Sequence, residues 1–403
     1  MSASSINGGA RLFLAFVLGF LAAMGPLCTD FYLPALPQMA ADLSTTASEM
    51  QLSITASLLG LSLGQLFFGP YSDAKGRKKP LLASLVVFII TSFLCGRATG
   101  IAELITLRFI QGLAGSGGMV LSRAIACDLF RGTDLTKFFA LLMLINGVAP
   151  IFGPVVGGQI MGMAAWPAIF YFLAICGVLQ FLLVLFGCGE TLPEEKRVQG
   201  GVASSVRGMC RLFKNKLFLY YLLLQGFLMA AFFGYISASP FVLQKLYGLS
   251  AQGYGLCFAL NGTGIMVFSF VTGRLCPRFG DRRLLRIGVA LCMVAAVLVA
   301  VVSILHLPVY WMVPSLFLFV SSTGIICTTS FSLAIAAQSE GAGSASGLLG
   351  VATFVFGAAA SPLVGLGGDS TAVPLGMLML LSNIFVVIFY KLASRREKRR
   401  ALD

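Results

Sequence analysis

The stretch GPYSDAKGRKKP, residues 69–80, separates two long apolar segments and carries the most specific pattern in the chain. Gly69 permits two helices to approach closely, and Gly76 permits a tight turn. Asp73 offers a carboxylate either to the first-turn amides of the next helix or to an arginine such as Arg77. A loop that only had to be basic would need the charges but not the glycines and the aspartate. The pattern therefore predicts a structured turn between two helices.

The composition predicts an integral membrane protein. Of the 403 residues, 58% are hydrophobic and only 11% are charged, which is more apolar side chain than one soluble core could bury. Most apolar segments reach the roughly 20 residues that an α-helix needs to cross the hydrocarbon core, whereas barrel strands have about 10. The ten cysteines are scattered without metal-ligand or CxxC spacing. A helical membrane protein without a metal site is therefore expected.

The net charge of +13 follows from topology rather than from a nucleic-acid partner. Lys and Arg concentrate in the loops 73–79, 131–137, 190–216 and 274–286 and in the tail 391–400. Alternate loops loaded in this way are cytoplasmic under the positive-inside rule. Both termini are therefore expected in the cytoplasm. The first apolar stretch has no small-residue cleavage site and is expected to be retained as a helix.

The apolar runs predict twelve transmembrane helices in two six-helix bundles. The helices lie near 11–38, 50–72, 79–97, 102–127, 136–163, 167–188, 217–245, 252–276, 284–305, 309–334, 343–367 and 373–393. The longest polar interval, 190–216, reads as a cytoplasmic linker. It divides an N-terminal bundle (1–189) from a C-terminal bundle with a basic tail (217–403).

The two bundles also resemble each other in sequence. Pro34 and Pro240 each precede a Leu-Ser pair by nine residues, at an offset of 206. GPYSDAKGRKKPLL from Gly69 is matched by GRLCPRFGDRRLL from Gly273, at an offset of 204, although Pro277 replaces the aspartate. Two matches in order at nearly one offset favour duplication. Repeated six-helix halves are the plan of transporters that move two bundles about a midplane site.

Charged side chains inside the apolar runs are few. Asp30 lies in CTDFYLPALPQM, residues 28–39, and Arg108 lies in the fourth helix. A charge at such depth costs about 2.5–3.5 kcal/mol on insertion scales, which makes it a functional hypothesis. If a side chain carries a coupling proton, Asp30 is the expected carrier, with Arg108 near it to tune its charge. The alternative is a structural aspartate that caps the helix break before Pro34.

Two further helices carry patterns. The fourth contains RFIQGLAGSGG from Arg108, with Gln111 one turn after the arginine and Asp128 at the inner end. The fifth reads NGVAPIFGPVVGG, residues 146–158, in which prolines remove backbone donors and glycines form a small-residue packing face. The residues of this motif are Pro150, Gly153, Pro154, Gly157 and Gly158.

Together these motifs resemble a known family. GxxxDxxGRK resembles the loop signature of the major facilitator superfamily, and the prolines and glycines of the fifth helix resemble its antiporter motif. TDxYLPALP is similar to the bicyclomycin/chloramphenicol resistance (Bcr/CflA) branch of drug:proton antiporters. The resemblance implies a twelve-helix fold in the bacterial inner membrane. It also implies a multidrug efflux transporter that works by alternating access, with protons as the coupling ion.

The resemblance implies roles for individual residues as well. Asp30 and Arg108 would serve proton coupling, and Gly69, Asp73, Gly76, Arg77 and Asp128 would form a gate on the inner side. A substrate cavity for small hydrophobic drugs is expected from helix position, lined by Tyr32, Gln111, Asn146, Tyr235, Ser239 and Asn261. No cofactor is expected beyond the proton gradient, and the protein is expected to be a monomer in the lipid bilayer.

Two other functions share some of these features. A proton-coupled exporter or symporter of a natural metabolite, such as an amino acid or a sugar, would share the fold and most motifs. A membrane enzyme would need a catalytic constellation, and the sequence offers one histidine, dispersed cysteines and no paired carboxylates within its apolar runs. An enzyme is therefore not expected.

Overall fold

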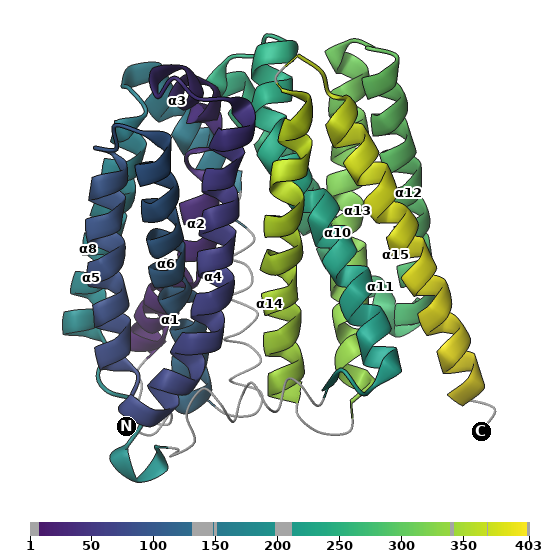
Figure 1. Ribbon diagram of the computed structural model, residues 1–403. Coiled ribbons are helices and arrows are strands. Elements are labelled where there is room, and N and C mark those ends of the chain that lie inside the picture. Colours follow the sequence, from purple (N-terminus) through teal and green to yellow (C-terminus); the bar gives the residue numbers. More distant parts are fainter. Residues whose placement is uncertain are drawn as a thin grey trace. The chain divides into compact units, whose positions relative to one another are not determined.

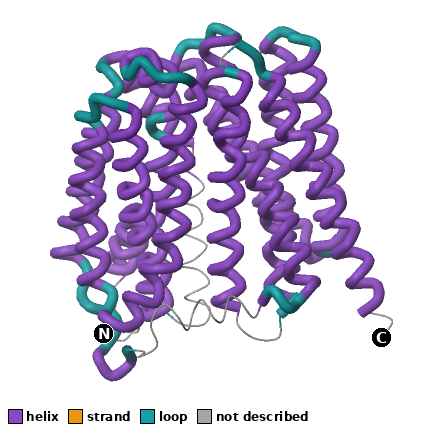
Figure 2. The backbone as a smooth tube through the Cα atoms, in the orientation of Figure 1, coloured by secondary structure: helices purple, strands orange, loops and turns teal. Residues whose placement is uncertain are grey.

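The computed structural model is helical throughout the described part of the chain, which comprises residues 8–130, 148, 151–197, 212–338, 342–368 and 370–400. Figure 2 shows helices joined by short loops in this part. Ten of its helices are long and apolar enough to cross a membrane, and a bent pair at the N-terminus adds one more. The predicted all-α membrane architecture is confirmed.

The chain divides into two compact units. The first unit contains Met1–Tyr32 and Ala56–Val206, and the second contains Leu33–Thr55 and Arg207–Asp403. The second unit thus includes the early segment Leu33–Thr55. Two hydrogen bonds join this segment to the later part of the unit. The side chain of Gln51 donates to the backbone carbonyl of Ser237 at 3.4 Å, and that of Gln244 donates to the backbone carbonyl of Pro34 at 3.1 Å.

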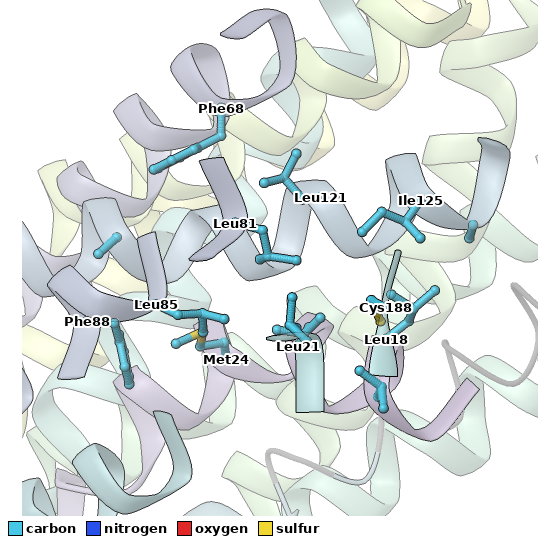
Figure 3. Close-up of a cluster of buried hydrophobic side chains, with 14 of the residues drawn as sticks. Leu18, Leu21, Met24, Phe68, Leu81, Leu85, Phe88, Leu121, Ile125 and Cys188 are labelled. Carbon is cyan, nitrogen blue, oxygen red and sulfur yellow. The ribbon is translucent and has the colours of Figure 1, made fainter. Parts of the chain in front are cut away.

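The first unit is built from α1 (Gly8–Ala22), α2 (Met24–Asp30), most of α4 (Ala47–Lys75), α5 (Lys78–Cys95), α6 (Ile101–Leu129), the helix Ile151–Met163 and α8 (Pro167–Gly187). Helix α5 packs against α6 and α8, and α1 packs against the same two helices (Figure 1). Their inward faces form an apolar core in which Leu18, Leu81, Leu85 and Leu121 are fully or almost fully buried (Figure 3).

The second unit begins with η2 (Leu33–Ala35) and α3 (Leu36–Asp42). It continues with α10 (Lys216–Pro240), the π-helical turn η4 (Phe241–Leu246), α11 (Ala251–Phe279), α12 (Asp281–Ile304), α13 (Val309–Ala336), α14 (Ala342–Ala360), the 3₁₀ turn η5 (Ser361–Gly367) and α15 (Val373–Arg400). Helix α10 packs against α13, α14 and α15, and α12 packs against α13 and α15. Helix α15 runs on through the predicted tail to Arg400.

The first predicted helix, 11–38, is not continuous. It bends by 42° at Ala23, between α1 and α2. After α2 the two prolines of the LPALP stretch lie in η2 and α3, which continue the chain to Asp42. Helix α2 itself ends at Asp30, and a turn at Phe31 and Tyr32 separates it from η2. The bend follows from Pro26, which has no N–H to donate to the carbonyl of Ala22 one turn earlier.

Glycines allow the backbones of α4 and α6 to approach closely. A Cβ added at Gly60 would lie 2.2 Å from the carbonyl oxygen of Phe109, and one added at Gly112 would lie 2.2 Å from that of Ser57. Gly69, for which close approach was predicted, does not need it, because its Cβ would lie 3.8 Å from Val120 in ordinary contact. The close crossing of α4 and α6 therefore lies at Gly60 and Gly112 rather than at Gly69, the first glycine of the loop motif.

Candidate functional site

Arg108 lies fully buried in the first unit, held by neutral groups. Its Nη2 donates to the backbone carbonyl of Cys28 at 2.9 Å, and its Nη1 donates to the side-chain oxygen of Gln111. Gln111 in turn donates to the hydroxyl of Ser92 at 2.7 Å. The guanidinium also lies over the ring of Tyr32, 4.2 Å from the ring centroid. A charge this deep, with no carboxylate of the described residues bonded to it, is expensive and indicates a functional role.

Asp30 is the buried carboxylate of the same region. It ends α2 with 5% of its surface exposed, and its Oδ1 accepts a hydrogen bond from the hydroxyl of Thr29 at 3.0 Å. Within the described residues it forms no ion pair, and the guanidinium of Arg108 is not among its bonded partners. The sequence predicted that the charges of Asp30 and Arg108 lie near each other. The structure connects them through α2, since Arg108 holds the carbonyl of Cys28 two residues before Asp30.

The glycine-rich fifth helix packs directly on Asp30 at its Cβ and backbone. A Cβ added at Gly153 would lie 3.0 Å from the Cβ of Asp30 and 3.6 Å from the ring of Phe31. Pro154, Gly157 and Gly158 are also buried in this helix. The antiporter-like motif and the buried carboxylate are therefore neighbours, which the sequence did not predict. Two predicted residues, Asn146 and Pro150, lie outside the described residues.

The predicted gate residues meet at the end of the first unit. Arg77 bonds both predicted carboxylates, Asp73 one turn earlier and Asp128 at the end of α6, where Nε lies 2.9 Å from Oδ2. It also donates to the hydroxyl of Ser72 at 2.7 Å. Gly76 has a φ of 89°, the left-handed conformation that the predicted tight turn requires. Of the two partners open to Asp73, the structure selects the arginine.

Glu190 completes this cluster and was missed by sequence reasoning. It follows α8 and accepts the backbone N–H of Arg77 at 2.8 Å and that of Lys78 at 3.1 Å, so it caps the N-terminus of α5 from 113 residues away. Arg77 itself makes no side-chain cap there. Thr191 donates its hydroxyl to Asp128 at 3.1 Å. The available signal was an acid placed directly after a transmembrane helix, in a linker otherwise rich in basic residues.

The charge of Glu190 predicts a pH-dependent contribution to stability. Partial burial opposes its ionisation, but backbone N–H groups of Arg77, Leu192, Lys78 and Thr191 outweigh this and lower the pKa of Glu190 below its ordinary value. A lowered pKa means that the contribution is fully present above about pH 4.5 and is lost as pH falls through the folded-state pKa.

The corresponding test is Glu190→Gln. Because the Glu190 side chain is largely exposed and its charge is screened, we expect an apparent melting temperature in detergent lower by about 1–2 °C at pH 7, the shift that about 0.5 kcal/mol produces, with the difference shrinking toward acid pH. Glu194→Gln is the matched control, because the Glu194 side chain is 86% exposed. A difference that stays constant from neutral to acid pH would contradict the role assigned to the charge.

In the second unit, three predicted cavity residues lie together in buried positions. The side-chain nitrogen of Asn261 donates to the hydroxyl of Tyr235 at 2.8 Å, and the hydroxyls of Ser239 and Tyr254 are 3.2 Å apart. Tyr235 also stacks on Phe258, with ring centroids 5.8 Å apart. The Oδ1 atom of Asn261 is buried without a hydrogen-bond partner. This polar and aromatic cluster offers flat ring surfaces and, as far as the described residues show, an unused acceptor at Asn261 Oδ1.

Among the described residues, no group of three or more His, Cys, Asp or Glu side chains could hold a metal ion. The arrangement instead offers a protonatable carboxylate, a fixed buried cation and a cluster of ionic bonds at one end of the first unit.

Known proteins that resemble this sequence are named as transporters or as drug resistance proteins. The sequence model of the Major Facilitator Superfamily matches residues 12–362. The chain is 43% identical over 393 residues to the uncharacterized MFS-type transporter YdgK of Bacillus subtilis, covering 97% of this chain and 98% of that protein. It is 30% identical over 384 residues to the bicyclomycin resistance protein homolog of Haemophilus influenzae, covering 95% and 96%. The multidrug resistance protein MdtL of Salmonella dublin is 30% identical, covering 69% and 70%.

Solved structures of other transporters share the fold of this chain. A bacterial homolog of the human lysosomal transporter Spinster superimposes with a TM-score of 0.74 at 15% identity, covering 96% of this chain and 98% of that one. The D-xylose–proton symporter also gives a TM-score of 0.74, at 16% identity, covering 93% and 96%. At such low identity these likenesses establish the fold alone.

Proposed function

Because this chain belongs to the major facilitator superfamily, we propose that it exports small hydrophobic, drug-like molecules in exchange for protons. The protein is a multi-pass membrane transporter and not an enzyme. Drug export is supported by two relatives whose names denote bicyclomycin resistance and multidrug resistance. The coupling ion, the inner membrane as its location and the cytoplasmic termini are parts of the proposal. No cofactor takes part in it, and the working unit is a monomer.

The observation that carries the proposal is Asp30, a buried carboxylate in contact with the fifth helix. An aspartate that is buried without an ion pair among the described residues is held with little stabilisation of its charged form. Protonation therefore changes its local interactions strongly, as coupling requires. In the proposed cycle a proton from outside reaches Asp30 and releases the substrate. Loss of that proton to the cytoplasm resets the carboxylate for the next substrate.

The gate cluster provides the second element of the proposal. Arg77 joins the turn after α4 to the end of α6, and Glu190 joins the start of α5 to the segment after α8. Alternating access needs bundle ends that move as units, and the ion pairs of Arg77 together with the hydrogen bonds of Glu190 link four helix ends of the first bundle. We assign these bonds to the state in which the cytoplasmic side is closed.

The direct test is transport by purified protein reconstituted in proteoliposomes. An imposed pH gradient is expected to drive the movement of bicyclomycin or chloramphenicol against its concentration gradient, with counterflow of protons recorded by a pH-sensitive dye. Collapse of the gradient by nigericin should abolish the movement. Drug transport that is indifferent to nigericin would refute proton exchange. Proton movement driven only by an amino acid or a sugar would refute drug export.

Gly153 is predicted to tolerate no larger side chain. A leucine there would push the fifth helix away from Asp30, so we expect Gly153→Leu to lower stability by about 1–3 kcal/mol and to abolish gradient-driven efflux. Apparent melting temperature and efflux measure the two effects. Gly273→Ala is the control, because a Cβ at Gly273 would meet nothing within 4 Å. Normal efflux by Gly153→Leu would show that close packing on Asp30 is dispensable.

A further inference from the structure

A basic cavity lies at one end of the second unit, where α11 ends and α12 begins. It has a volume of about 640 Å³ and is lined by Phe279, Gly280, Asp281, Arg282, Arg283, Arg286 and Leu333. A smaller cavity shares two of these arginines and adds the hydroxyl-bearing residues Tyr221, Tyr390 and Ser394. None of these residues has a part in the proposed exchange of drug for protons.

The positive charge of this cavity is only partly neutralised. The segment 274–286 contains five arginines and one acid, Asp281. The Asp281 carboxylate accepts hydrogen bonds from the thiol of Cys276 at 2.8 Å and from the hydroxyl of Ser332 at 2.9 Å, so it bonds neutral groups. Arg282 pairs with Glu397 at 2.8 Å. Glu397 pairs with one arginine and Asp281 adds one further negative charge, so the three arginines that line the cavity still exceed the nearby acids.

Arg283 and Arg286 are the available cations. Both are exposed, and within the described residues neither has a carboxylate oxygen within 4 Å. The Nε of Arg286 donates to the hydroxyl of Tyr390 at 3.1 Å, and the guanidinium of Arg283 lies 5.5 Å from the centroid of the Phe279 ring. Each guanidinium is thus oriented by a neutral aromatic group while its remaining N–H groups stay free for an anion.

Backbone N–H groups at the start of α12 add further hydrogen-bond donors beside the two guanidinium groups. Helix α12 begins after Gly280, which has a φ of 76° and offers no side chain to cap the first turn. The first-turn N–H groups of a 24-residue helix therefore face the cavity end without a side-chain acceptor. Guanidinium groups together with a helix N-terminus favour a phosphate or another oxyanion.

The surroundings decide which phosphate fits. The predicted spans Ala251–Phe279 and Asp281–Ile304 meet at this cavity, so it lies where two helices leave the hydrocarbon. Phe279, which lines the cavity, is 40% exposed, and Ile287, next to Arg286, is 46% exposed. A ligand that combines an anionic headgroup with acyl chains contacts the arginines and the apolar face of the same two helices at once.

We propose that this cavity binds the phosphate headgroup of an anionic phospholipid, such as phosphatidylglycerol, from the leaflet on the side of the basic loops. Arg283 and Arg286 hold the phosphate, and the acyl chains lie along the exposed apolar face of α11 and α12. Arg282 remains paired with Glu397 and anchors α12 to α15 beside the bound lipid.

The test is native mass spectrometry of the full-length protein, with phosphatidylglycerol and phosphatidylcholine titrated separately. The variant R283Q/R286Q is expected to lose about tenfold or more in affinity for phosphatidylglycerol, with no change for phosphatidylcholine. The charge-keeping variant R283K/R286K is expected to stay within about threefold of the wild type, because Lys still binds phosphate as a point charge. K75Q/K79Q removes two exposed basic residues from the first unit and is expected to bind as the wild type does.

Three outcomes would overturn the proposal. The first is equal phosphatidylglycerol affinity in wild type and R283Q/R286Q. The second is an equal loss in K75Q/K79Q, which would mean that general surface charge is responsible. The third is full competition by millimolar inorganic phosphate or glycerol phosphate, which would mean a site for a free anion. Because affinity for phosphatidylcholine is measured on every variant, a folding defect in R283Q/R286Q would appear as a loss for both lipids and would not count as support.

Discussion

Replacing Asp30 with asparagine is expected to uncouple transport while leaving the protein folded. Asparagine has the same shape, and its side-chain oxygen can still accept the hydrogen bond from Thr29. It cannot bind and release a proton near neutral pH. Gradient-driven efflux should therefore fall by on the order of 100-fold, the size typical of removing a proton-transferring group. Downhill drug exchange between the two sides should remain, because it needs no net proton movement.

The measurement is drug efflux from proteoliposomes with and without an imposed pH gradient. Asp42→Asn is the matched control, because Asp42 is an exposed aspartate at the end of α3. Apparent melting temperatures of both variants should lie near that of the wild type. Efflux by Asp30→Asn that still follows the gradient would mean that another group carries the proton, and the assignment of Asp30 would fail.

Arg108→Lys is expected to have the next largest effect, although the charge is kept. The guanidinium reaches the carbonyl of Cys28 with one nitrogen and Gln111 with another. A lysine ammonium is a single point and cannot bridge both acceptors in this geometry. Helix α2, which carries Asp30, would then lose its fixed position. Because displacement by about 1 Å can cost about 100-fold in a positioned site, we expect a comparable loss of coupled efflux.

Two readouts separate positioning from a general structural defect. The pH at which efflux is half-maximal should shift in Arg108→Lys, because the environment of Asp30 changes, and drug binding should stay within about threefold, since the lost bonds are not with substrate. Arg97→Lys, at an exposed helix end, is the control. An unshifted pH profile together with a uniform loss of binding would show that Arg108 only supports the fold.

The loop GPYSDAKGRKKP, residues 69–80, shows how much local chemistry can be predicted from sequence. The turn at Gly76 and the partnership of Arg77 with Asp128 follow from residue types and from the length of α6, since an arginine and an aspartate at the same membrane level find each other. Whether Gly69 or a neighbour makes the close approach could not be predicted. That depends on the height at which α4 and α6 cross, and small residues occur along both helices.

The partners of the buried charges were harder to predict for a physical reason. Arg108 is satisfied by a backbone carbonyl, which every residue possesses, so no sequence pattern marks Cys28 as its acceptor. The bend at Ala23 has a local cause in Pro26, yet prolines are common in transmembrane helices and many leave the helix nearly straight. Contacts between a side chain and a backbone carbonyl far away in the sequence are thus the part that only the folded chain reveals.

The position of Glu190 has a consequence for dividing the protein into halves. By sequence the first bundle ends at residue 189 and the linker starts at 190, but the acid that caps α5 is the first residue of that linker. A fragment ending at Gly189 would lack the acceptor for the amides of Arg77 and Lys78. One that extends past Leu192, whose own amide bonds Glu190, would keep it. For separate expression of the halves, the functional boundary therefore lies several residues beyond the last transmembrane helix.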